Sequence, residues 1–204
     1  MEAFHNNPLI KEYYFNRLNK HYQADEIVKG IYWQNGKGCA VGCTIHSSSH
    51  KNYESELGIP ENIANLQDRI FEQLPNKLAK EFPLQFLSAI KVGANLSKVS
   101  KLFTIWLLTD IEYGVLQYAE NKKVIQDIAD AFVQDMVSPV SIEKWLELRK
   151  NAKAAADFNT DYTASYAYSS ALYYASAAYS VKNTKSEWYI AASKKLIELL
   201  KEAN

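Results

Sequence analysis

Most of the chain repeats apolar residues at the spacing of an amphipathic helix, and proline or glycine interrupts each repeat. Such a pattern constrains the fold strongly, because a period of 3.6 residues buries one face of a helix and not of a strand. We therefore predict a mainly α fold, a single-domain helical bundle over residues 1–204. The predicted helices span 8–22, 50–57, 60–75, 76–82, 83–92, 97–119, 122–137, a stretch from 142, 152–181 and the tail from Thr184.

Capping signals mark the ends of several of these helices. Asn7 followed by Pro8 is typical of a helix N-terminus, and Thr184 with Glu187 has the spacing of a capping box. Pro83 is expected to break the 76–92 region into two helices, because proline lacks a donor and clashes one turn back. Asp110 falls on the apolar stripe of the 97–119 helix, where a carboxylate needs a partner or a raised pKa.

The strongest signal for β structure is the pair Asn35-Gly36, which lies between two short runs rich in aromatic and β-branched residues. We predict a small β-hairpin near residues 31–45, its second strand reaching about Val41. A loop that carries cysteines and histidines would follow, so that hairpin and loop together occupy residues 30–50.

Charge and hydropathy exclude several classes of function. The 204 residues hold 23 basic and 23 acidic side chains, so no overall field attracts nucleic acid, and a nucleic-acid partner is not expected. The longest apolar run, 102–108, is far shorter than the ~20 residues of a membrane span. The first residues lack the pattern of a secretory signal. We expect a cytoplasmic protein without a membrane partner, in which both cysteines stay reduced.

Cys39, Cys43, His46 and His50 are spaced four, three and four residues apart. On a helix they would share one face with Glu54, which suggests a metal site. However, eleven residues of helix extend about 16 Å, too far for one ion. The nearby Gly38 and Gly42 are poor helix formers, and we expect a strand and a loop here instead.

Three interpretations of this segment remain open. The cysteines are small buried side chains on one face of a strand. Alternatively, Cys43, His46, His50 and Glu54 hold a divalent metal such as zinc. In the third interpretation Cys39 or Cys43 is a thiol nucleophile activated by His46 or His50, so that these four residues are the catalytic candidates.

Two further regions attract attention. Asp68 and Glu72 share one face of the 60–75 helix, but this face lies about 150° from the apolar stripe, and we expect it to be solvent-exposed. Residues 152–181 are rich in Ala, Ser and Tyr, with six of the fourteen tyrosines between 162 and 179. Small residues allow close helix packing, and the tyrosines offer a face for another protein or for self-association.

The stretch Gly38-Cys39-Ala40-Val41-Gly42-Cys43 with His46, the stretch 57–60 and the stretch 68–75 together resemble an uncharacterised family of bacterial and phage proteins. The similarity covers most of the chain and includes the Ala-rich tail. The family has no established activity, so no site residue is carried over. The resemblance implies a phage-associated accessory role.

No complete catalytic or cofactor motif is present, and we therefore favour a cytosolic accessory or binding protein that takes part in protein–protein interaction. The alternative is a hydrolase that uses the Cys/His loop, through either a metal or a thiol. Substitution of Cys39 or His46 would change only stability in the first case and would abolish activity in the second.

Overall fold

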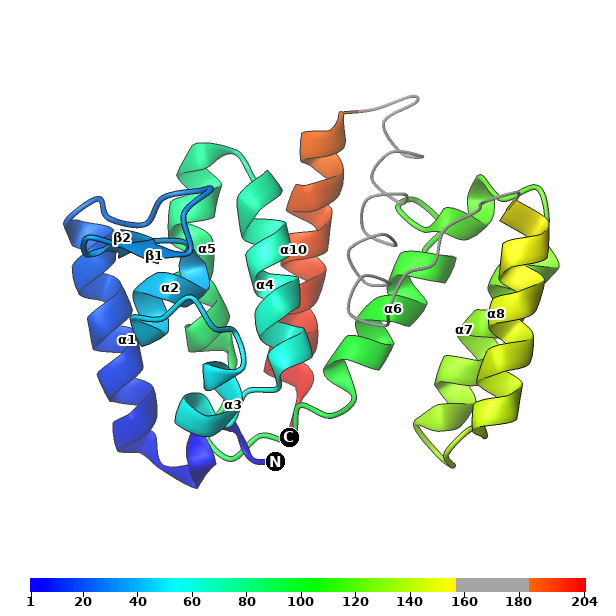
Figure 1. Ribbon diagram of the computed structural model, residues 1–204, viewed down its shortest axis with the longest axis horizontal. Helices are drawn as coiled ribbons and strands as arrows, with labels where there is room; N and C mark the ends of the chain where they lie inside the picture. Colours follow the sequence, from blue (N-terminus) through cyan, green and yellow to red (C-terminus); the bar gives the residue numbers. More distant parts are fainter. Residues whose placement is uncertain (157–183) are drawn as a thin grey trace. The chain divides into compact units, whose positions relative to one another are not determined.

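Helices dominate the computed structural model, which describes residues 1–156 and 184–204 (Figure 1). Within these residues the strands are β1 (Trp33–Gln34) and β2 (Lys37–Gly38), which pair antiparallel. The predicted mainly α fold with a small hairpin is confirmed. The helix predicted over 152–181 lies outside the described residues, except for 152–156.

The chain divides into two compact units. Unit 1 comprises Met1–Ser100 and Tyr189–Asn204, and unit 2 comprises Lys101–Trp188. The single domain expected from the sequence stays a prediction.

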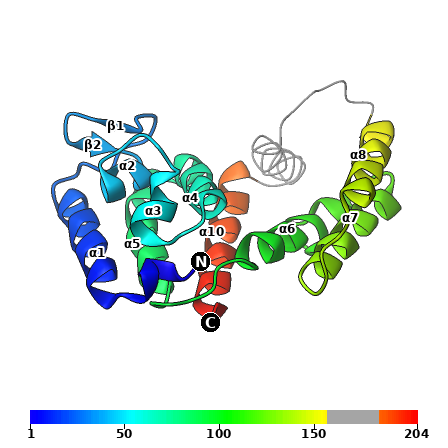
Figure 2. The ribbon, with the colours of Figure 1, turned by 60° about the horizontal axis from the view of Figure 1, so that its bottom comes forward.

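Unit 1 holds most of the helices and the hairpin. Helix α4 packs against α2, α3 and α5, and α1 packs against α2 and α5, as Figures 1 and 2 show. Aromatic and aliphatic side chains such as Leu18, Phe71 and Phe86 are fully buried between them. The elements are η1 (Ala3–Asn6), α1 (Pro8–Gln23), β1, β2, α2 (Ala40–Ile45), α3 (Asn52–Leu57), α4 (Glu61–Gln73), α5 (Asn76–Ala89) and the larger part of α10 (Lys185–Glu202).

Local sequence signals account for the start of α1 and for the hairpin turn. The Asn7 side chain accepts a hydrogen bond from the Leu9 N–H, and Pro8 opens the helix, as predicted. Asn35 and Gly36 both have positive φ, +50° and +80°, which is the conformation that a two-residue hairpin turn of type I′ requires.

Pro83 does not break a helix, and this prediction is wrong. Helix α5 continues through Pro83, which lies buried on the same side as Phe82 and Phe86. Burial of this continuous apolar face outweighs the one hydrogen bond that proline cannot donate.

Unit 2 contains α6 (Val99–Thr109, from Lys101 on), η2 (Val115–Gln117), α7 (Lys122–Asp135) and α8 (Ile142–Ala156). The single helix predicted over 97–119 is wrong, because α6 ends at Thr109. The Asp110 side chain accepts hydrogen bonds from the N–H groups of Glu112 and Tyr113, at 3.0 and 2.9 Å. A side chain that bonds to the following backbone favours a turn over a helix, and Asp110 finds its partners in this turn.

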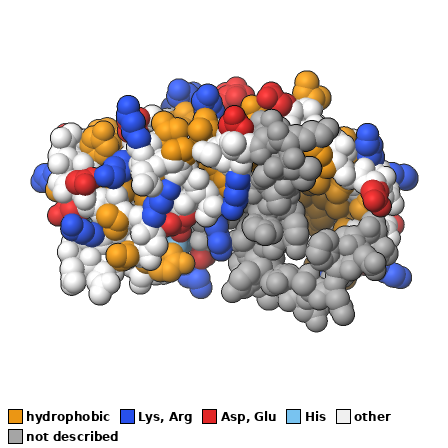
Figure 3. All heavy atoms as spheres, turned by 90° about the horizontal axis from the view of Figure 1, so that it is seen from above, with side chains coloured by type: hydrophobic (Ala, Val, Ile, Leu, Met, Phe, Trp, Pro, Cys, Tyr) orange, Lys and Arg blue, Asp and Glu red, His pale blue; other side chains and the backbone are white. Residues whose placement is uncertain are grey.

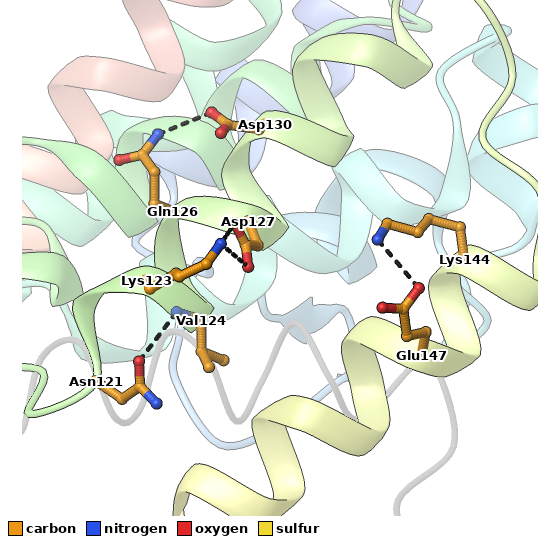
Figure 4. Close-up of polar contacts among 8 residues, drawn as sticks. All are labelled: Asn121, Lys123, Val124, Gln126, Asp127, Asp130, Lys144 and Glu147. Carbon is orange, nitrogen blue, oxygen red and sulfur yellow. Dashed lines mark hydrogen bonds and ion pairs between the residues drawn. The ribbon is translucent and has the colours of Figure 1, made fainter.

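Helices α7 and α8 pack against each other through Phe132 and Trp145, whose ring centroids lie 4.9 Å apart. Figure 4 shows polar pairs along these helices, among them Lys123 with Asp127 and Lys144 with Glu147. Exposed pairs of this kind add little stability and belong to a solvated face. The capping box predicted for Thr184 and Glu187 is confirmed at the start of α10. Asn121 caps α7, and Ser141 caps α8.

Candidate functional site

The segment with both cysteines forms a short helix, α2, which follows the hairpin directly (Figure 2). The strand predicted to reach about Val41 is wrong, because β2 ends at Gly38, and the predicted loop is present only over residues 46–51, between α2 and α3. Every residue of Ala40–Ile45 is buried, and tertiary packing overrides the low helix propensity of Gly42 and Thr44. Gly42 is required for this packing, because a Cβ there would lie 1.6 Å from the Tyr32 carbonyl oxygen.

Both thiols lie inside unit 1 as free cysteines. Cys39 caps the N-terminus of α2, and its Sγ accepts a hydrogen bond from the Gly42 N–H at 3.4 Å. Cys43 Sγ donates to the carbonyl oxygens of Gly38 and Glu26, at 3.3 and 3.5 Å. Cys39 is 1% exposed and Cys43 is 0% exposed, which agrees with the interpretation that they are small buried side chains. They lie at and in helix α2, however, and not on a strand.

Burial raises the pKa of both thiols. The pKa of Cys43 rises to about 12, and burial together with the nearby Asp68 carboxylate raises that of Cys39 still further. Since the thiolate is the reactive form of cysteine, both groups are unreactive thiols near neutral pH in this arrangement.

Cys39 belongs to a set of polar side chains that we call the inner polar cluster: Cys39, His50, Tyr53, Gln67 and Asp68. All are buried except the half-buried His50, and they come from the start of α2, the loop before α3, α3 and α4. His50 Nε2 lies 3.3 Å from Asp68 Oδ2, and the Tyr32 ring packs edge-on against the His50 ring with centroids 5.6 Å apart. The Asp68 carboxylate is also near enough to Cys39 to raise the pKa of its thiol.

The prediction that Asp68 and Glu72 face solvent is wrong for Asp68, which is only 8% exposed. Helices α2 and α3 cover the face of α4 that the sequence pattern assigned to water. Glu72 is half-buried on the same face, where both of its carboxylate oxygens lie 3.1 Å from the Gly30 N–H. Burial raises the pKa of Glu72.

The inner polar cluster holds buried polar atoms without a hydrogen-bond partner in the described parts of the chain. They are His50 Nε2, Tyr53 OH, both polar atoms of the Gln67 amide, and Asp68 Oδ1. Thr44 and Gln67 approach the Tyr53 hydroxyl, and Asp68 approaches His50, but none of these approaches has the geometry of a hydrogen bond. Such atoms are costly in a protein interior.

A second group lies at the other end of α2. His46 ends this helix in the left-handed conformation, with φ +53°, and its Nε2 lies 2.8 Å from Nε2 of His21 on α1. We call His21 and His46 the histidine pair. On its other side, His21 Nδ1 lies 2.6 Å from Glu26 Oε2.

Trp33 of the hairpin holds the two rings of the histidine pair. It stacks on His46 with a centroid distance of 4.4 Å and an angle of 9°, and meets His21 edge-on at 5.5 Å. Residue 46 is exposed as a whole, but part of its imidazole ring is shielded from water. This shielding, and then the positive charge of Arg17, lower the pKa of His46. The neutral imidazole is therefore favoured at neutral pH.

The residues singled out in the sequence have separate partners. Cys43 bonds to backbone carbonyls, His46 meets His21, His50 meets Asp68, and Glu54 accepts a hydrogen bond from the Glu61 N–H at 3.0 Å. Among residues 1–156 and 184–204, no three Cys, His, Asp or Glu side chains are placed to hold one metal ion. The zinc site at Cys43, His46, His50 and Glu54 stays a prediction.

Sequence reasoning missed His21, Glu26 and Trp33 around the histidine pair, and Tyr53 and Gln67 in the inner polar cluster. His21 and Glu26 are five residues apart, across the end of α1, a spacing that no helix pattern connects. The only sequence signal for any of these residues was the Asn35-Gly36 turn. It predicts the hairpin that places Trp33 against His46.

Comparisons with protein-family models, with curated proteins and with solved structures find no match to the chain. In the described residues no helix combines the length and the apolar character needed to cross a membrane.

Proposed function

We propose that this chain is a cytoplasmic accessory protein that acts by binding another protein. The observation that carries the proposal is the burial of both thiols, which bond to the backbone and have raised pKa values. A catalytic cysteine needs an accessible thiolate. Burial makes both thiols inaccessible and favours their protonated form.

The surface proposed for the partner is the aromatic face of unit 1, formed by Tyr13, Arg17, Trp33 and His46. Arg17 lies over the Tyr13 ring, 4.6 Å from its centroid, and donates to the Thr44 carbonyl oxygen at 3.2 Å. Tyr13 is 55% exposed. Tyr, Trp and Arg are enriched at the energetic centres of protein interfaces, and side chains already held in place lose less entropy on binding.

The distribution of charge supports a protein partner over a nucleic acid. The chain has no net charge, and on the face drawn in Figure 3 the Lys and Arg side chains lie among Asp and Glu. A nucleic-acid backbone needs a continuous basic surface, whereas mixed charge around aromatic side chains is ordinary for protein interfaces.

Site-specific photo-cross-linking in cells tests this proposal. A photoreactive residue is placed at position 13, and as a matched control at Gln73, which is exposed at the end of α4. We expect a discrete protein adduct from position 13 only, and its loss when Arg17→Ala is added. Equal adducts from both positions, or an adduct that Arg17→Ala leaves unchanged, would contradict the aromatic face.

A further proposed contact is the Ala/Ser/Tyr-rich segment 152–181, through which the chain binds a protein or itself. The small residues and tyrosines of this segment support the protein contact. The resemblance to bacterial and phage proteins supports a phage-associated role. Light scattering of the full chain and of Ala171→Glu measures self-association. We expect a concentration-dependent dimer that the added charge weakens, and a monomer at all concentrations would reject self-association.

The inner polar cluster favours a second candidate function, a cysteine-dependent hydrolase. Cys39 at a helix N-terminus, His50 and Asp68 converge there. His50 Nε2 faces Asp68 Oδ2 at 3.3 Å and not the thiol, so catalysis would require the His50 ring to leave Asp68 and reach Sγ. Hydrolysis of a panel of thioesters by the parent chain, abolished in Cys39→Ala and in His50→Ala at an unchanged melting temperature, would establish this function. A parent chain no more active than the variant that carries both substitutions would reject it.

A further inference from the structure

The histidine pair has the arrangement of an imidazole ligand with its supporting carboxylate. A carboxylate can only accept, so the 2.6 Å contact between His21 Nδ1 and Glu26 Oε2 places the His21 proton on Nδ1. The lone pair of His21 is therefore on Nε2, directed at His46. Metal-binding histidines have this same support, which fixes the tautomer and raises the basicity of the ligand nitrogen.

We propose that His21 Nε2 and His46 Nε2 bind one divalent transition-metal ion of the Zn²⁺ or Cu²⁺ type. This site goes beyond the protein-binding role and does not depend on it. Imidazole nitrogen is a preferred ligand of these ions, and neither thiol takes part.

The separation of the two nitrogens fits the replacement of their hydrogen bond by a metal ion. They lie 2.8 Å apart, a distance at which one imidazole N–H donates to the other nitrogen. Two nitrogens about 2.0–2.1 Å from one tetrahedral ion would be about 3.3 Å apart. An opening of roughly half an ångström, with a turn of the His46 ring, admits the ion, and the proton of the neutral His46 ring moves from Nε2 to Nδ1 through solvent, which frees the Nε2 lone pair.

His46 can make this adjustment at little cost. It is exposed at the end of α2, and the flat Trp33 ring beneath it allows the imidazole to slide without loss of stacking. Its left-handed backbone is uncommon for a residue other than glycine, and such conformations cluster at functional sites.

The site is an open one. The described residues supply no third Cys, His, Asp or Glu ligand, so water would complete the coordination. By the usual order of divalent ions, Cu²⁺ should bind more tightly than Zn²⁺.

Calorimetric titration of the full, untagged, metal-free chain with Zn²⁺, and separately with Cu²⁺, tests the proposal. We expect one ion per chain, with saturable binding lost in His21→Gln and in His46→Gln. Glu26→Gln should weaken binding about 10–100-fold without abolishing it, because it removes only the support of His21. His5→Gln and His50→Gln are matched controls that should bind as the parent chain does.

Imidazole nitrogen resonances provide a second readout that separates binding from folding. The ion should shift the Nε2 signals of His21 and His46 in the parent chain, while circular dichroism shows that each variant retains its helices. Absence of saturable binding by the parent chain, or binding that a folded His21→Gln variant retains, would overturn the proposal.

Discussion

The two ends of helix α2 place potentially reactive side chains in opposite environments. At its N-terminal end, Cys39 joins a buried cluster in which polar atoms lack partners. At its C-terminal end, the exposed His46 belongs to a hydrogen-bonded chain that runs through His21 to Glu26. The difference is one of accessibility: burial keeps the thiol protonated, and exposure leaves the imidazole available to a ligand.

The comparison also concerns stability. Unpartnered buried atoms such as those of Tyr53 and Gln67 oppose folding, so the surrounding apolar packing must offset them. The histidine pair is hydrogen-bonded and partly solvated, so it should neither raise nor lower the free energy of unfolding by much. Substitutions at the two ends of α2 should therefore differ in kind.

The largest expected effect is that of Tyr53→Ala, whose side chain is fully buried beside α2. Loss of a buried aromatic ring should lower the free energy of unfolding by about 3–5 kcal/mol. Tyr13→Ala is the matched exposed change and should alter it by no more than about 0.5 kcal/mol. Urea unfolding measures both, and equal losses would break the distinction between the two environments.

Gly42→Ala should cost about 3 kcal/mol, the upper end of the range for overpacking. The nearest atom to the added Cβ is a backbone carbonyl oxygen, which cannot rotate away. Gly36→Ala provides the control, because its Cβ meets no atom within 4 Å and its cost is only that of positive φ, about 1 kcal/mol. Thermal unfolding compares the variants, and a Gly42→Ala protein as stable as the control would show that the hairpin does not hold α2 closely.

Alkaline pH should destabilise the fold through the two thiols. Their pKa values are raised in the folded state, so ionisation in the unfolded chain, near the ordinary value of 9, favours unfolding. The contribution of the thiols to the free energy of unfolding is fully present well below pH 9. It falls as the pH rises above 9, by up to about 1.4 kcal/mol per pH unit for each thiol. Urea unfolding between pH 7 and 10 should show this slope, and a Cys39→Ala, Cys43→Ala chain should lack it.

Local signals predicted much of the fold. Asn7 with Pro8, Asn35 with Gly36, and the Thr184–Glu187 box each act through bonds or dihedral angles of neighbouring residues. Their outcome is therefore largely independent of the rest of the chain, and all three were confirmed.

Features that depend on distant packing could not be predicted in this way. The buried face of α4 includes Asp68 because α2 and α3 cover it, and α2 is helical because the hairpin and α4 enclose it. Pro83 is tolerated for the same reason. The histidine pair requires that α1 pass beside the end of α2, which no spacing between His21 and His46 reveals.

Alkylation of the native chain by iodoacetamide near neutral pH, followed by mass spectrometry, tests the central claim most directly. The buried thiols of Cys39 and Cys43 should remain unmodified until denaturant unfolds unit 1, and then both should react. Rapid modification of Cys39 in the folded protein would contradict a buried, protonated thiol and would favour the hydrolase over the binding protein.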